Sequence, residues 1–208
     1  MRTIRKGPEP KSLLEYRKAA DAHYDGYQAK QDVREQLVAE QRGLCCYCQS
    51  RIRASAEDMK IEHWQCQTDY PKRQLDYGNL LGACKGNEGQ PHDKQHCDTR
   101  KGNSALCFSL CDTTHPIELK IRFIGNGEIT SNDEAVRTAL NEVLNLNWTR
   151  LVENRKSALT GFLQGLGTAK LDYAKELSKW DGTLDGELPP FSQIVAHYLL
   201  KKLGRLPA

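Results

Sequence analysis

Four short segments within residues 45–102 decide the fold of this chain: CCYC at 45–48, IEHW at 61–64, NLLGAC at 79–84 and HCDTRKG at 96–102. Cysteines at both ends of this region flank an adjacent acid and histidine, Glu62 and His63, and an asparagine, Asn79. The region has weak hydrophobic periodicity and many turn residues, so it offers little apolar mass for a core. A segment of this kind typically needs a bound metal to stay folded.

The cysteines have a distribution typical of metal ligands. All 8 lie between Cys45 and Cys111, whereas a secreted disulfide scaffold spreads its cysteines through a short chain. Structural zinc takes four Cys or His ligands in a tetrahedron, and two intervening residues let both thiolates of a pair face one ion. The predicted ligands of a structural zinc ion are Cys45, Cys48, Cys84 and Cys97.

The second cysteine pair is less regular than the first, because residues 85–96 separate its two members. This insertion is rich in turn formers and is expected to loop out. The competing ligand candidates are Cys46, Cys66, His92 and His96. A second metal site at Cys107, Cys111 and His115 is a further alternative, although cysteines in the core or at its edge are the favoured interpretation.

The overall composition is that of an ordinary soluble protein, with 208 residues, 27% charged residues, 7% aromatic residues and a net charge of +3. This charge is too small to indicate nucleic acid binding by itself. No apolar run approaches the ~20 residues of a membrane span, and no apolar stretch follows the basic N-terminus as it would in a secretory signal. We therefore expect a cytoplasmic protein with no membrane partner.

Periodicity and turn signals predict an α+β fold that is mostly helical. Residues 1–42 are expected to form a helical lead-in, with helices at 12–25 and 31–42, the first beginning with a capping box at Ser12. Residues 43–115 are expected to form the core, with strands at 59–64 and 79–83 and a helix that begins near Cys97 or Asp98. In residues 116–208 the sequence predicts a β-hairpin and then a helix that begins with a second capping box at Ser131. Three further helices are predicted over 149–166, 168–180 and 191–203.

The acid and the histidine are the candidate catalytic pair. Neighbours on a strand point to opposite faces, so Glu62 and His63 reach one site only near a bend or a strand end. A histidine can accept a proton from water near neutral pH, and a carboxylate can hold a hard cation such as Mg²⁺. Asp98 is a second candidate carboxylate. Lys101 lies on the same helix face as Asp98, where it is expected either to meet a phosphate or to be a solvated surface lysine.

These motifs, in this order, resemble the HNH endonucleases, whose fold is called ββα-metal. The matching positions are Glu62-His63 at the end of the first strand, Asn79-Leu80 in the connection, and residues 97–102 at the start of the helix. The resemblance implies that the zinc-stabilised core is a ββα-metal core in which His63 is the general base that activates water. It also implies that Asn79 pins the loop and orients this histidine.

The same resemblance implies that Glu62 and Asp98 hold a catalytic divalent metal on the scissile phosphate. This chain departs from the family at Asp98, where the family usually has His or Asn. Two carboxylates favour Mg²⁺ or Mn²⁺ over a softer ion. His96 is the alternative for this position.

A closer resemblance is to PtuB, the HNH component of Septu-type anti-phage defence that some retron operons also encode. It is carried by residues 43–48, 61–63, 79–84 and 96–98, and in the tail by 144–147 and Arg155. It implies a PtuA-like partner ATPase, encoded alongside, that restrains the nuclease and docks on the helical tail. DNA is the favoured substrate and tRNA the alternative. The competing hypothesis is a zinc-stabilised module that binds nucleic acid or a partner without cutting.

Overall fold

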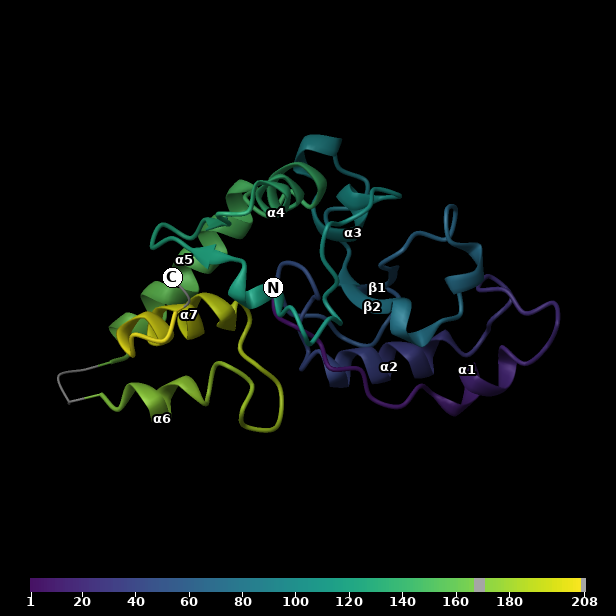
Figure 1. Ribbon diagram of the computed structural model, residues 1–208, viewed down its shortest axis with the longest axis horizontal. Helices are drawn as coiled ribbons and strands as arrows, with labels where there is room; N and C mark the ends of the chain where they lie inside the picture. The colour runs from purple at the N-terminus through teal and green to yellow at the C-terminus, as the bar shows by residue number, and fades with distance from the viewer. Residues whose placement is uncertain (167–170, 207–208) are drawn as a thin grey trace.

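The computed structural model describes residues 1–166 and 171–206. In it, helices and two small antiparallel sheets form a fold of the predicted α+β type. Helices α5, α6 and α7 lie at one end of the molecule, and α1, α2 and the first sheet lie at the other (Figure 1). Among the described residues, none of the helices combines the length and the apolar character that crossing a membrane requires.

The first sheet consists of β1, Met59–His63, and β2, Leu80–Cys84. The strands pair antiparallel, with Met59 opposite Cys84 and His63 opposite Leu80. Neighbouring residues of a strand point to opposite faces, and both faces of β2 are covered. Leu80 packs with the N-terminal helices, whereas Leu81 packs with the cysteine-rich segment. This explains why β2 is a continuous apolar run that is buried along its whole length.

Helix α1, Lys11–Tyr16, is much shorter than the predicted helix at 12–25. The predicted capping box is wrong, because the Ser12 hydroxyl does not cap the helix. It lies 2.8 Å from the Tyr27 hydroxyl and donates to an Asp32 carboxylate oxygen at 2.5 Å instead. Contacts from later in the chain therefore take the hydroxyl away from the helix start.

Helix α2, Lys30–Glu40, agrees with its prediction except at its last residues. Its buried residues Val33 and Leu37 pack against Leu13 of α1. After the helix, Gly43 has a φ of +75° and its amide donates to the Val38 carbonyl at 2.8 Å. A left-handed residue of this kind is the usual way to end a helix, and here it delivers the chain to the first cysteine pair.

The predicted β-hairpin is present as β3, Arg122–Phe123, and β4, Ile129–Thr130. The first strand of the hairpin is short, because the preceding residues Ile117–Leu119 form a 3-10 helix instead of extending the strand. Gly127 lies in the turn with a φ of +99°, and a Cβ atom there would come within 2.2 Å of the Val152 carbonyl oxygen. Only glycine therefore lets the turn lie against the helix that follows.

The described residues after the hairpin contain α4 at Glu134–Thr138, which continues into a π-helix at Ala139–Val143, α5 at Thr149–Gln164, α6 at Tyr173–Leu177 and α7 at Ser192–Lys202. Asp133, not Ser131, caps α4 by accepting from two backbone amides, because the Ser131 hydroxyl donates to the Lys120 carbonyl at 2.6 Å. The predicted start of α6 at Thr168 lies outside the described residues.

One buried cluster joins all three predicted parts of the chain. It includes Met1 from the lead-in, Cys46 and Leu81 from the central segment, and Leu140 and Leu151 from the C-terminal part. A second C-terminal cluster is formed by α5, α6 and α7. The central segment therefore folds as part of a larger core, and the tail is not an independent appendage.

Candidate functional site

The four predicted cysteines form a buried group. The sulfur atoms of Cys45, Cys48, Cys84 and Cys97 all lie within 4.8 Å of one another. The Cys45 and Cys97 sulfurs are 3.9 Å apart, and the Cys48 and Cys84 sulfurs are 3.7 Å apart. Zinc–sulfur bonds of about 2.3 Å put the corners of a tetrahedron about 3.8 Å apart, whereas a disulfide would need about 2.0 Å. These residues therefore fit a metal ion such as zinc.

Backbone contacts hold the cysteines in this arrangement. The amide of Cys84, at the end of β2, donates to the Cys45 sulfur at 3.3 Å. Cys97 begins helix α3, Cys97–Lys101, with a φ of +57°. Burial raises the pKa of the Cys97 thiol well above its usual range. A bound cation is therefore needed for the four groups to be thiolates together.

The insertion at residues 85–96 loops out as expected and returns to its starting point. The His96 amide donates to the Gly86 carbonyl at 3.0 Å, and the Asn87 side chain donates to the Lys94 carbonyl at 2.7 Å. Gly86 has a φ of +56°, and a Cβ atom there would lie 2.1 Å from the His96 carbonyl oxygen. Glycine at this position thus lets the loop close and bring Cys97 back to Cys84.

The competing ligand candidates do not belong to the four-sulfur group. Cys46 packs in the core, and Cys66 donates to an Asp69 carboxylate oxygen at 3.2 Å. The His96 ring stacks on Trp148, and its Nδ1 lies 3.2 Å from the Cys97 sulfur. His96 thus belongs to the surroundings of the cysteine group.

The alternative second metal site is not formed. The four cysteines are the one group, in the part of the chain that the structure describes, in which three or more potential ligand atoms approach within 4.8 Å. Cys107 is exposed, and the His115 ring pairs with Asp112 at 3.0 Å. Cys111 is partly buried, as expected for a cysteine at the edge of the core.

A cavity of about 500 Å³ lies next to the β1–β2 sheet, and Glu62, His63 and Asp98 all line it. The structure therefore brings together three of the predicted catalytic residues. His63 is the last residue of β1, which is where an adjacent pair can reach one site. Asp98 is the second residue of α3, directly after a predicted zinc ligand. The cysteine group thus fixes the position of one wall of the cavity.

The hydrogen bonding of His63 determines which of its two ring nitrogens carries the proton. Its Nε2 lies 2.9 Å from the Gln74 carbonyl oxygen, and the ring meets Tyr24 edge to face at 4.4 Å. A carbonyl only accepts, so Nε2 carries the proton and Nδ1 keeps its lone pair. Burial lowers the pKa of His63 below its usual value. At neutral pH the ring is therefore uncharged and can accept a proton.

Asn79 ties together the ends of the loop between β1 and β2. Its side-chain amide donates to the carbonyls of Gln65 at 3.0 Å and Arg73 at 3.2 Å, and its oxygen accepts from the Gln65 amide at 2.8 Å. Asn79 is completely buried, so water does not compete for these hydrogen bonds. By fixing this loop, Asn79 also fixes the neighbouring Gln74 carbonyl that orients His63.

Glu62 is a buried carboxylate with two partners on one oxygen. The Lys101 ammonium lies 2.9 Å from it, and the Tyr47 hydroxyl donates to it at 2.7 Å. Burial raises the pKa of Glu62 well above its usual range, the nearby Asp98 carboxyl raises it further, and Lys101 opposes both. The position of Tyr47 within the CCYC motif gave no sign that it serves Glu62.

The two expectations for Lys101, a phosphate contact or a solvated surface lysine, are both wrong. Lys101 is 2% exposed, and besides Glu62 its ammonium donates to the carbonyls of His63 and Gly102 at 3.3 Å each. A lysine in this position neutralises the buried carboxylate and supports the turn after α3. It has no surface from which to reach a substrate.

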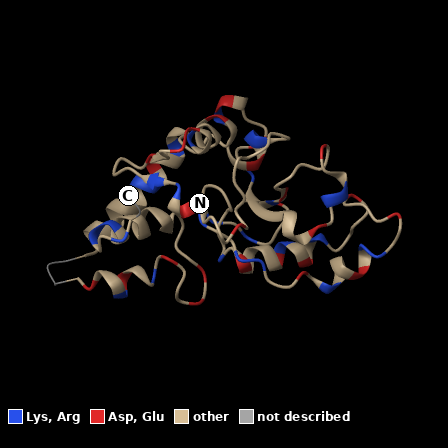
Figure 2. Ribbon diagram, in the orientation of Figure 1, with Lys and Arg blue, Asp and Glu red and all other residues tan. Residues whose placement is uncertain are grey.

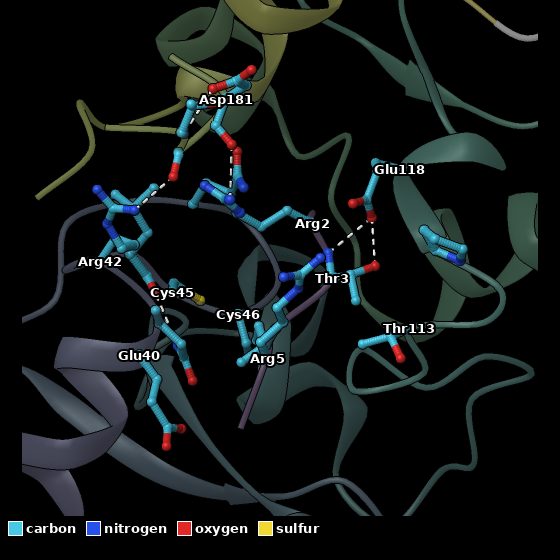
Figure 3. Close-up of a pocket in the computed structure, with 17 residues that line it drawn as sticks. Arg2, Thr3, Arg5, Glu40, Arg42, Cys45, Cys46, Thr113, Glu118 and Asp181 are labelled. Carbon is cyan, nitrogen blue, oxygen red and sulfur yellow. Dashed lines mark hydrogen bonds between the residues drawn. The ribbon is translucent and has the colours of Figure 1, made fainter. Parts of the chain in front are cut away.

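A second cavity, of about 480 Å³, is lined by the N-terminal residues and by Cys45, but not by Glu62, His63 or Asp98. Figure 3 shows Arg2 and Arg42 pointing toward the segment around Asp181. Arg2 donates to the Asp181 carbonyl at 2.9 Å, and Arg42 donates to the Gly182 carbonyl at 2.8 Å. The arginines therefore anchor this segment against the N-terminal part of the chain, and the acid–histidine pair does not line this cavity.

Comparison with models of known protein families and with curated protein sequences found no match.

Proposed function

We propose that this chain is a metal-dependent endonuclease with an HNH-type, ββα-metal core. The observation that carries the proposal is the His63 ring, which is neutral, has its Nε2 held by the Gln74 carbonyl, and lines the same cavity as two carboxylates. The order β1, β2, α3, with α3 in contact with β2, supports the same proposal (Figure 1).

In the proposed reaction, His63 Nδ1 takes a proton from a water molecule that attacks the phosphorus of a phosphodiester. The opposite P–O ester bond breaks, and its oxygen leaves with a proton taken from solvent. Glu62 and Asp98 supply the hard oxygen ligands that Mg²⁺ or Mn²⁺ prefers, and such an ion would neutralise the charge that develops on the phosphate. The raised pKa of Glu62 beside Asp98 fits this role, since two neighbouring carboxylates need either a shared proton or a cation.

The test compares purified wild-type protein with His63→Ala on plasmid DNA and on total tRNA, each with Mg²⁺ or Mn²⁺. We expect the variant to lose cleavage and to keep its zinc content and thermal unfolding temperature. His115→Ala is the matched control, because this histidine is exposed and lies outside the cavity. Full cleavage by His63→Ala would refute the assignment. Nucleic acid binding by the wild type without cleavage would favour a non-cutting zinc module.

The proposed substrate is DNA, with tRNA as the alternative, and the proposed partner is a PtuA-like ATPase in an anti-phage defence system. Both proposals rest on the sequence resemblance. The partner is tested by co-expression with the ATPase and co-purification through a tag on either protein. Independent elution of the two proteins would argue against it.

A further inference from the structure

Lys60 is the one cationic side chain among the described residues that line the cavity. It lies two residues before Glu62 on β1, so both side chains leave the same face of the strand. Its Nζ lies 2.9 Å from the Thr99 hydroxyl and 3.8 Å from an Asp98 carboxylate oxygen. The side chain is 24% exposed, unlike that of Lys101. A substrate in the cavity can therefore reach Lys60.

In the free protein the Lys60 ammonium is paired with Glu88. The Glu88 carboxylate belongs to the insertion at 85–96, lines the cavity, and lies 2.8 Å from Nζ. Lys60 lowers the pKa of Glu88, so the carboxylate is charged at neutral pH. The Glu88 side chain is 54% exposed, and ion pairs this accessible to water contribute little to stability. Another anion can therefore replace the carboxylate at small cost.

The other charged side chains around the cavity are mostly acidic, so a polyanionic substrate needs the Lys60 ammonium in order to bind. Glu62, Asp98 and Glu88 all line the cavity, and the Lys101 ammonium is already occupied by Glu62. Over the whole fold, Lys and Arg are interspersed with Asp and Glu (Figure 2). With a net charge of only +3, a single accessible lysine beside the reacting groups matters for attracting a phosphate.

We propose that Lys60 binds a backbone phosphate of the nucleic acid substrate, and that Glu88 occupies the same ammonium until the substrate displaces it. Binding exchanges one anion for another at Lys60 Nζ, with Thr99 keeping the ammonium in place. The inference rests on the proposed nuclease function. It assigns Lys60 a contact with the substrate. It also implies that Glu88, in the insertion at 85–96, competes with the substrate phosphate for the Lys60 ammonium.

The test measures binding rather than cleavage, by fluorescence anisotropy of labelled DNA and RNA oligonucleotides in a His63→Ala background. Lys60→Met is expected to weaken binding and to reduce the slope of log affinity against log salt concentration by about one, as loss of one phosphate contact requires. Lys60→Arg keeps the charge and is expected to retain binding. Glu88→Gln is expected to tighten binding roughly two- to fivefold, the range that removing an exposed ion pair predicts.

The decisive comparison is Glu88→Gln in the Lys60→Met background, where its effect is expected to shrink, because Lys60, at 2.8 Å, is nearer to Glu88 than Lys85, at 3.8 Å. Asp93→Asn is the matched control, since it removes an exposed acid from the same insertion outside the cavity. An equal gain from Asp93→Asn, or an unchanged Glu88→Gln effect without Lys60, would overturn the inference alone. Absence of any nucleic acid binding by the parent protein would overturn the inference and the proposed function together.

Discussion

The Lys101 ammonium lies 2.9 Å from the Glu62 carboxylate, and both side chains are almost completely buried. The pair joins the last turn of α3 to strand β1, and therefore links the two elements that carry Asp98 and His63. The charge of Glu62 is matched inside the protein, so the acid can be placed at the cavity without leaving an uncompensated charge.

Lys101→Met is expected to destabilise the protein by about 3–5 kcal/mol, because it leaves the buried Glu62 carboxylate without its counter-charge. Chemical denaturation followed by circular dichroism measures this loss. Lys120→Met, which removes an exposed lysine, is the matched control and is expected to change stability little.

A second change distinguishes loss of the ion pair from loss of packing. Adding Glu62→Gln to Lys101→Met removes the orphaned charge and is expected to restore part of the stability. If the double variant is as unstable as the sum of the two single variants, the ion pair is not the cause.

Sequence patterns predicted those parts of the site that depend on local spacing. The Cys45–Cys48 spacing indicated a metal centre, and the resemblance to the HNH endonucleases placed His63 at the end of the first strand. The burial of Lys101 could not be predicted, because it depends on Tyr47 and Glu62 from separate segments. The orientation of His63 by a backbone carbonyl was equally hidden, since any residue at that position can supply one.

The same reasoning explains the errors in the fold. A capping box describes only what neighbouring residues offer one another, and both Ser12 and Ser131 bond instead to residues far away in the chain. Helix α4 therefore begins after Asp133, whereas α1 begins at Lys11, close to its prediction, and differs from it by ending at Tyr16. The second strand of the first sheet was predictable from its own residues, because Leu80–Cys84 is an apolar run.

Cys48→Ser is expected to abolish metal binding, reducing the zinc content from about one ion per chain to near zero, because one of four tetrahedral ligands is lost. The thermal unfolding temperature should fall, since the four cysteines belong to the main buried cluster and the metal would hold them together. Metal analysis and calorimetry on the same samples measure both effects.

Cys46→Ser is the matched control for the metal centre. Cys46 is buried next to a ligand but lies outside the four-sulfur group. The variant is expected to keep its zinc and to lose about 1–3 kcal/mol, the cost of a buried hydroxyl. Equal zinc loss in both variants would mean that the assignment of ligands is wrong.

Asn79→Ala is expected to destabilise the protein by about 3 kcal/mol, because it leaves buried backbone groups of Gln65 and Arg73 without partners. Cleavage should fall by more than the folded fraction does, since the loop that carries Gln74 no longer fixes His63. Asn132→Ala, at an exposed position, is the control and should change neither quantity. A stable Asn79→Ala protein with full activity would show that the hydrogen bonds of Asn79 are not needed to hold the loop in place.

The lowered pKa of His63 predicts the pH dependence of cleavage. Burial is the main cause, the nearby Lys101 lowers the pKa further, and the Asp98 carboxylate opposes both. A base with a lowered pKa is protonated only at lower pH, so activity should rise with pH through a midpoint below about 6.5 and be constant above it. Protonation of Glu62, whose pKa burial raises well above its usual range, would also reduce activity as the pH falls, but by competing with the divalent metal. Initial rates measured from acid to neutral pH at two Mg²⁺ concentrations separate the two causes. A midpoint that moves to lower pH with added Mg²⁺ would assign the acid limb to Glu62, whereas a fixed midpoint assigns it to His63.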